Sequence, residues 1–154
     1  MRLVEGNSQE YSHTMAKVLL LTNTQGASAE VLPALGLLSH TVKVLPLEAS
    51  VLIDAPVMDL IFVDARREFP TAKSLTKLMT TTGVESPIIV ITTEGGLTAI
   101  SADWQISDVI LDSAGPAEVD ARIRLAVDTR NFDRIAAEGV STEIRQGEVV
   151  IDEG

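Results

Sequence analysis

The sequence has 154 residues, no cysteine and 22 acidic against 12 basic residues, so its formal net charge is −10. A chain of this length forms one core that buries roughly two-thirds of the surface exposed when unfolded. The acidity predicts repulsion from nucleic acid and anionic membranes, and the absence of cysteine excludes disulfides, thiolate catalysis and thiolate metal sites.

The first 15 residues are mostly polar where a signal peptide would carry its apolar run. We predict a disordered extension over residues 1–15, with regular structure beginning at residue 16. No later stretch approaches the roughly 18 apolar residues that a transmembrane helix needs. The expected location is therefore the cytoplasm, without contact to a membrane.

Five short apolar runs, each bounded by turn-forming residues, predict strands that are buried on both faces. They are residues 18–21, 42–45, 60–63, 87–92 and 109–111. Helical patterns lie between and after them, at residues 31–38, 48–54, 70–83, 97–104 and 115–128. This alternation predicts a three-layer α/β fold. Its five-stranded parallel sheet has the flavodoxin-like order 2-1-3-4-5, with a crevice where strands 1 and 3 diverge.

After residue 128 the sequence becomes rich in charged residues, and a new apolar pattern begins near residue 142. These changes divide the chain after the N-terminal extension into three parts. Residues 16–128 form the domain that contains the sheet, residues 129–141 form a charged linker, and residues 142–154 begin a second domain. The last part is too short to be stable by itself.

The predicted topology brings to the crevice the polar residues that follow the strands. These are Thr22 and Asn23 after strand 1, Asp64 and Arg66 after strand 3, Thr92 after strand 4 and Asp112 after strand 5. An isolated carboxylate there is costly unless it is paired. Arg66 and Thr22 can supply a charged fork and a hydroxyl, which predicts a static Asp64–Arg66–Thr22 cluster. The alternative is that Asp64 caps its loop while Arg66 points to solvent.

An aspartate that ends an apolar strand in this crevice resembles the phosphoacceptor of CheY-type receiver domains. The resemblance extends over residues 59–64 and 87–92, and over Asp108 followed by Pro116, Glu118 and residues 121–124, which are similar to the OmpR/PhoB family of response regulators. Further segments resemble the GlnR family. They are residues 31–35 (VLPAL), 38–42 (LSHTV), 63–66 (VDAR), 94–97 (EGGL), 101–104 (SADW) and 115–122 (GPAEVDAR).

The GlnR resemblance implies a nitrogen-metabolism transcription regulator with an atypical receiver, no partner kinase and a C-terminal winged-helix domain that binds DNA. Residues 146–154 resemble the opening strands of that winged helix. DNA is then contacted only through this further domain, and RNA polymerase is a further expected partner. No enzymatic activity is expected.

Comparison with ordinary receivers places Asp64 at the phosphoacceptor position but changes its surroundings. Receivers hold magnesium with two acids after strand 1, where this chain has Thr22 and Asn23, and pair the phosphoryl group with a lysine at the position of Asp112. Thr92 keeps the usual hydroxyl. We therefore expect no metal, no cofactor and no catalytic residue. A phosphorylation-competent receiver and a domain that binds a flavin or another small ligand remain as alternatives.

The same resemblance implies a homodimer through helix 4, strand 5 and helix 5. Asp108 and Arg122 stand where that family forms an intersubunit ion pair. Glu118 matches a second such position, but no basic residue between positions 94 and 108 completes it. The expected apolar contacts are Leu97, Ile100, Trp104 and Val119. For Trp104 the alternative is a packed core or cap position, which is the more common role of such a residue.

Overall fold

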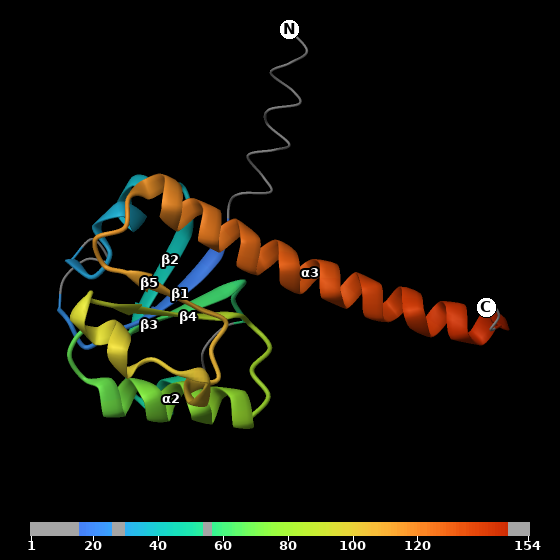
Figure 1. Cartoon of the computed structure of the whole chain (residues 1–154), viewed down its shortest axis with the longest axis horizontal. Helices are drawn as coiled ribbons and strands as arrows, with labels where there is room; N and C mark the ends of the chain where they lie inside the picture. Colours follow the sequence, from blue (N-terminus) through green and yellow to red (C-terminus); the bar gives the residue numbers. More distant parts are fainter. Residues whose placement is uncertain (1–15, 26–29, 54–56, 148–154) are drawn as a thin grey trace, which may run out of the picture.

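The computed structural model describes residues 16–25, 30–53 and 57–147, and its centre is a five-stranded sheet (Figure 1). The strands are β1 (Lys17–Leu21), β2 (Thr41–Leu45), β3 (Leu60–Asp64), β4 (Ile88–Thr92) and β5 (Asp108–Leu111). Every neighbouring pair is parallel, and the order is β2-β1-β3-β4-β5. The predicted fold class and strand order are thus confirmed.

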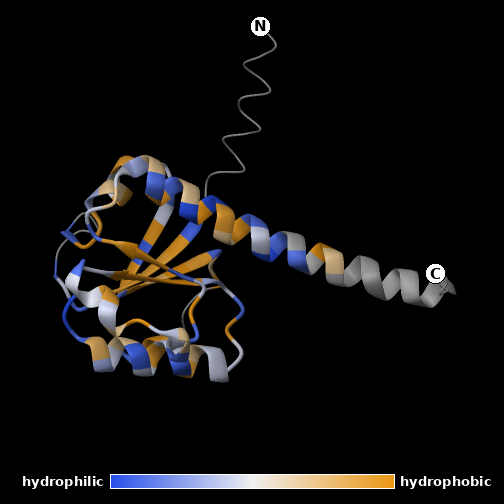
Figure 2. Cartoon of the chain, in the orientation of Figure 1, coloured by the Kyte–Doolittle hydropathy of each residue, from blue (hydrophilic) through white to orange (hydrophobic). Residues whose placement is uncertain are grey.

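Two long helices cover opposite faces of the sheet, α2 (Phe69–Thr81) and α3 (Pro116–Gly147). On one face Val119 and Ile123 of α3 join the core formed by alternate residues of the central strands, such as Phe62. On the other face Leu75 and Met79 of α2 join a second core. Figure 2 shows the apolar strands between these two polar-coated layers. Burial on both faces explains why the central strands read as continuous apolar runs.

Helix α2 illustrates how the sequence sets its own boundaries. Pro70 lies in the first turn, where its missing N–H is not needed. Ala72, Leu75 and Met79 then recur on one side and are all buried. The helix ends before Gly83, whose φ of 91° is the left-handed conformation that glycine adopts without steric cost.

Three of the predicted helices are shorter and tighter than expected. Residues 31–38 contain only the 3-10 helix η2 (Pro33–Leu37), and residues 48–54 contain only η3 (Ala49–Leu52). The predicted helix at 97–104 is two 3-10 helices, η4 (Gly95–Ala99) and η5 (Ala102–Trp104), separated by extended backbone at Ile100 and Ser101. Segments of three to five residues are too short for the costly nucleation of an α-helix, so they close single 3-10 turns instead.

Helix α3 is longer than predicted. Residues 129–141, expected as a linker, are helical, and so are residues 142–147. No proline follows Pro116 within this range, and the i,i+4 ion pairs Glu118–Arg122 and Asp120–Arg124 favour the first part of the helix. Figure 1 shows α3 projecting away from the sheet. The predicted extension at 1–15 and residues 148–154 lie outside the described residues.

Candidate functional site

The candidate site lies at the carboxyl ends of β1 and β3, where the strand order reverses. Asp64 is the last residue of β3, and Thr22 directly follows β1. Their exposed fractions are 7% and 4%. Crevices at such switch points are where open parallel sheets bind ligands, so the contacts of Asp64 decide what this domain can do.

Both carboxylate oxygens of Asp64 accept hydrogen bonds at short distances. Oδ1 accepts from the Arg66 main-chain N and Nε at 3.1 and 2.9 Å, and Oδ2 accepts from Arg66 Nη2 at 3.1 Å. The Thr22 hydroxyl donates to Oδ2 at 2.6 Å. Arginine and carboxylate thus form a two-pronged, charge-assisted pair. The structure brings together the three residues of the predicted cluster, with Arg66 turned inward rather than toward solvent.

Thr24 is a fourth member that sequence reasoning missed. Its hydroxyl accepts from Arg66 Nη2 at 2.7 Å and donates to Asp64 Oδ2 at 3.5 Å. The Thr24 main-chain N donates to the Thr22 hydroxyl at 3.0 Å, a local turn that brings Thr24 back toward the crevice. A second hydroxyl residue two positions after Thr22 could have indicated this contact from the sequence. Nothing in the sequence indicates the contact of Arg66 Nη1 with the Glu30 carbonyl, at 3.2 Å, because it depends on a distant loop.

These contacts determine the ionisation of Asp64. Burial is the largest influence and raises its pKa, but hydrogen bonds from the Arg66 side chain, the Thr22 hydroxyl and the Arg66 main chain, with the Arg66 charge, lower the pKa below its ordinary value. The bond to Asp64 likewise raises the pKa of Arg66. At neutral pH the carboxylate of Asp64 is therefore ionised and the guanidinium of Arg66 is protonated.

The other predicted crevice residues make different contacts. The side chain of Asn23 bonds to residues other than Asp64: its Nδ2 donates to Glu68 Oε1 at 3.0 Å, and its Oδ1 accepts from the Leu47 main chain at 2.9 Å. The fully buried hydroxyl of Thr92 donates to the carbonyl of Ala65 at 3.2 Å. Asp112 acts only at a distance, where its charge helps to raise the pKa of Arg66.

A magnesium ion of the kind that receiver domains bind does not fit these residues. Mg²⁺ needs near-octahedral oxygen ligands, yet both oxygens of Asp64 are held by Arg66, and Thr22 and Asn23 offer no charge. Within residues 16–25, 30–53 and 57–147, no group of three or more His, Asp or Glu side chains is arranged to hold a metal. A cation beside Asp64 would also have to displace the guanidinium.

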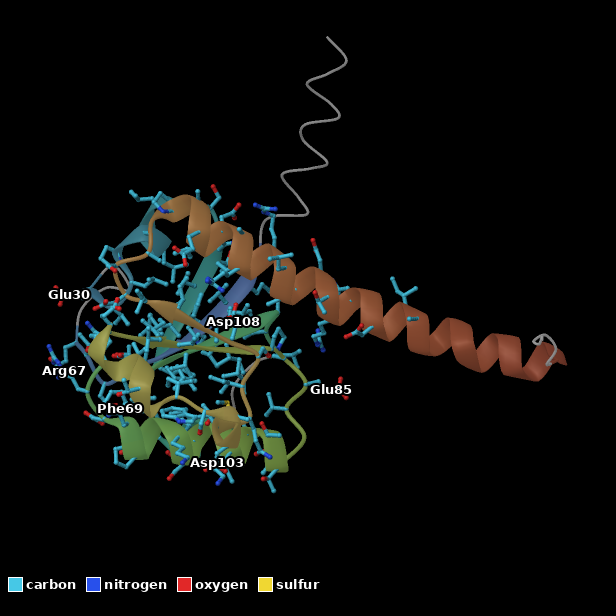
Figure 3. All side chains as sticks on the ribbon, in the orientation of Figure 1. Glu30, Arg67, Phe69, Glu85, Asp103 and Asp108 are labelled. Atoms are coloured by element: carbon cyan, nitrogen blue, oxygen red, sulfur yellow. The ribbon has the colours of Figure 1, made fainter. Side chains whose placement is uncertain are left out.

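The space beside Asp64 is small. The cavity has a volume of about 70 Å³ and is lined by Asn23, Thr24, Leu47, Asp64, Arg67 and Glu68. Pockets for cofactor-sized ligands have volumes of about 300–1,000 Å³ and usually aromatic walls. A flavin therefore does not fit here. Figure 3 shows Arg67, Glu30 and Phe69 at this end of the sheet and Glu85 at the other.

Two residues predicted as dimer contacts are instead part of the core, and that prediction is wrong for them. Trp104 is 1% exposed and Val119 is 0% exposed. The indole Nε1 donates to the Ala99 carbonyl at 2.8 Å, which folds η4 and η5 onto each other. Leu97 and Ile100 remain partly exposed.

The ion pair expected between subunits forms within this chain. Arg122 Nη1 lies 2.8 Å from Asp108 Oδ2, and Arg122 Nε lies 3.2 Å from Glu118 Oε2. The hydrogen bond to Asp108 raises the pKa of Arg122. Glu118 thus finds its basic partner one turn along its own helix, which sequence reasoning overlooked.

A family model described as the N-terminal domain of the transcription regulator GlnR matches residues 16–127. None of the curated proteins matches the chain in sequence.

Solved structures with the same fold have low sequence identity to this chain, and several of them are described as signal receiver domains. NtrX from Brucella abortus is 15% identical with a TM-score of 0.67, over 80% of this chain and 29% of NtrX. The receiver domain of a putative LuxO repressor from Vibrio parahaemolyticus is 9% identical, with a TM-score of 0.61 over 79% of this chain and 97% of that domain. A Pseudomonas fluorescens Pf-5 receiver domain is 16% identical, with a TM-score of 0.63 over 79% and 93%.

The chain thus spans less than a third of NtrX, and at these identities the neighbours show the fold alone. In the part of the chain that the structure describes, no helix combines the length and apolarity needed to cross a membrane. The family match covers the whole sheet and the first part of α3, including the Asp64 cluster. The chain belongs to the GlnR transcription-regulator family, of which residues 16–127 form the N-terminal receiver domain.

Proposed function

We propose that this receiver domain works without phosphorylation in a regulator of nitrogen metabolism. In this proposal Asp64 is a fixed structural anion, and the domain dimerises to position a C-terminal winged-helix domain that binds DNA. The acidic receiver itself does not contact DNA, because it carries few cations for phosphate.

The contacts of Asp64 carry the proposal. Attack on a phosphoryl group requires a carboxylate oxygen that is free to approach phosphorus, and a cation that neutralises the transferred oxygens. Here Oδ1 accepts two hydrogen bonds and Oδ2 accepts two at 3.1 Å or less. The acids that would hold the cation are replaced by Thr22 and Asn23.

A phosphodonor experiment tests this part of the proposal. The protein is incubated with acetyl phosphate and Mg²⁺, and its intact mass is measured beside an Asp64→Asn control and an ordinary receiver. We expect no added phosphoryl group on the wild type while the ordinary receiver is modified. A phosphoryl adduct that Asp64→Asn abolishes would overturn the proposal.

The face formed by β5 and α3 is the best candidate for dimerisation. A groove of about 520 Å³ runs between the 84–88 loop, the start of β5 and α3. Leu125 lines it and is 67% exposed. The groove also carries both signs of charge, with Arg122 and Arg130 beside Asp108 and Glu85. A two-fold axis brings each patch against its own copy, so mixed charge makes such a face self-complementary.

Sedimentation velocity of Leu125→Glu tests the dimer. We expect the wild type to dimerise and Leu125→Glu to shift toward monomer, because an apolar contact is replaced by a charge on an acidic protein. Leu37→Glu is the matched control, since Leu37 is 75% exposed and does not line the groove. A monomeric wild type, or equal effects of both variants, would contradict this interface.

The nitrogen role is tested in cells. Transcripts of nitrogen-assimilation genes are compared under nitrogen limitation between the wild-type allele and an Arg66→Met allele. We expect these transcripts no longer to respond to nitrogen limitation in the Arg66→Met allele. An unchanged response would contradict a role of the Asp64 cluster in this regulation.

A further inference from the structure

Gly96 is the buried residue of η4, and it is packed tightly against side chains of other elements. A Cβ built on Gly96 would overlap the hydroxyl oxygen of Thr92 and lie 2.8 Å from Cζ of Phe69. The neighbouring Gly95 has nothing within 4 Å of the same position. Gly96 does not have a positive φ. It is therefore required by the space available, and not by backbone conformation.

The Thr92 hydroxyl that lies against Gly96 makes one hydrogen bond to the interior of the domain. Thr92 is 0% exposed, and its hydroxyl donates to the Ala65 carbonyl at 3.2 Å. A side chain at residue 96 would force this hydroxyl to rotate or Phe69 to move. Close contact with the Gly96 backbone thus restricts the rotamer of Thr92.

The Ala65 carbonyl belongs to the same peptide group as the Arg66 main-chain N–H. A peptide group is planar, so fixing its oxygen also fixes the direction of its hydrogen. That N–H donates to Asp64 Oδ1 at 3.1 Å. The Ala65 N–H is held as well, by the Ile91 carbonyl at 2.8 Å. Thr92 therefore determines, through one rigid plane, how the chain presents Arg66 to Asp64.

We propose that Gly96 is a positioning residue for the Asp64 cluster. Its bare backbone holds the Thr92 hydroxyl on Ala65, and this contact keeps the Arg66 peptide aimed at Asp64. The inference rests on the proposed function only in treating that cluster as the working state of the domain.

NMR of the glycine variants tests the proposal without any phosphodonor. The probes are the main-chain amide and Nε–Hε of Arg66 and the carboxyl carbon of Asp64. We expect Gly96→Ala to shift all three several-fold more than Gly95→Ala does. Gly95→Ala is matched, because it makes the same change in unfolded-chain entropy at the adjacent residue.

Two variants of Thr92 keep the test decisive if Gly96→Ala does not fold. Thr92→Ser retains the hydroxyl, and we expect its Arg66 amide to remain near the wild-type position. Thr92→Val removes the donor to Ala65, and we expect the same amide to shift strongly. Equal shifts in Ser and Val variants, or a destabilised Gly96→Ala with unshifted Arg66 and Asp64 resonances, would overturn the proposal. Phosphorylation of Asp64 in the mass experiment would contradict the proposed function but leave this coupling intact.

Discussion

Replacing Arg66 with methionine removes the cationic partner of Asp64 while keeping a side chain of similar length. The variant loses the bonds from Nε and Nη2 to the carboxylate, at 2.9 and 3.1 Å, but keeps the main-chain N–H and the Thr22 hydroxyl. The side chains of Arg66 and Asp64 are only 12% and 8% exposed, so water cannot fully replace the lost partner. Losing one partner of such a buried pair costs about 3 kcal/mol.

The pH dependence gives this prediction its sharpest signature. In the wild type the pKa of Asp64 is lowered, so its contribution to stability is present above the pKa of an unfolded aspartate and is lost as the pH falls through the folded value. In Arg66→Met the effect of burial, the largest influence on this group, is no longer offset by the guanidinium, and the pKa of Asp64 rises. The difference in unfolding free energy between the two proteins is therefore largest near neutral pH and narrows on acidification.

Urea unfolding of both proteins between neutral and acidic pH measures this difference. Arg67→Met is the control, because Arg67 is the adjacent arginine and is exposed. We expect the control to change the unfolding free energy by less than about 0.5 kcal/mol at every pH. An Arg66→Met difference that is equally small, or one that does not change with pH, would refute the assigned role of the ion pair.

Three further outcomes follow from contacts outside the cluster. Arg122→Ala breaks the pair with Asp108, but both side chains are over one-third exposed, so we expect thermal unfolding to show a loss of at most about 1 kcal/mol that shrinks in high salt. Trp104→Ala empties a fully buried site and removes the bond to the Ala99 carbonyl, and we expect circular dichroism in urea to show a loss of about 3–5 kcal/mol. The side chain of His40 is 2% exposed, and its Nδ1 accepts a hydrogen bond from the main-chain N–H of Ala16, just before β1, at 2.9 Å. We expect His40→Ala to cost about 1–3 kcal/mol in urea unfolding, whereas a cost near zero would show that water replaces the ring.

The strands and their order could be predicted because their signals are local. Each strand is a short apolar run bounded by turn formers, and the alternation with helices leaves few topologies. The cluster was also accessible, because Asp64 ends a buried strand and Arg66 lies two residues later. A buried carboxylate that binds no metal needs another positively charged partner, and Arg66 is the nearest basic residue in the sequence.

What failed depended on contacts between distant parts of the chain. The sequence shows that Trp104 is aromatic and lies near a surface turn, but not that the turn folds inward to give the indole N–H an acceptor. Likewise Asp108 and Arg122 suggest an ion pair without revealing whether it closes within one chain or between two. The predicted helix ended at residue 128 because the segment that follows is rich in charged residues, but charge alone does not end a helix.

Helix α3 extends well beyond the sheet, so a small change in its angle moves its far end much further than its near end. Arg130 holds the helix to the body, where its Nε donates to the Glu85 carbonyl at 3.1 Å. Beyond Arg130 the helix extends for roughly 25 Å, at a rise of about 1.5 Å per residue. A tilt of only about 5° at Arg130 therefore moves the far end by ~2 Å. A small change in the angle of this helix is therefore amplified along its length, and under the proposed function it would be passed to the DNA-binding domain.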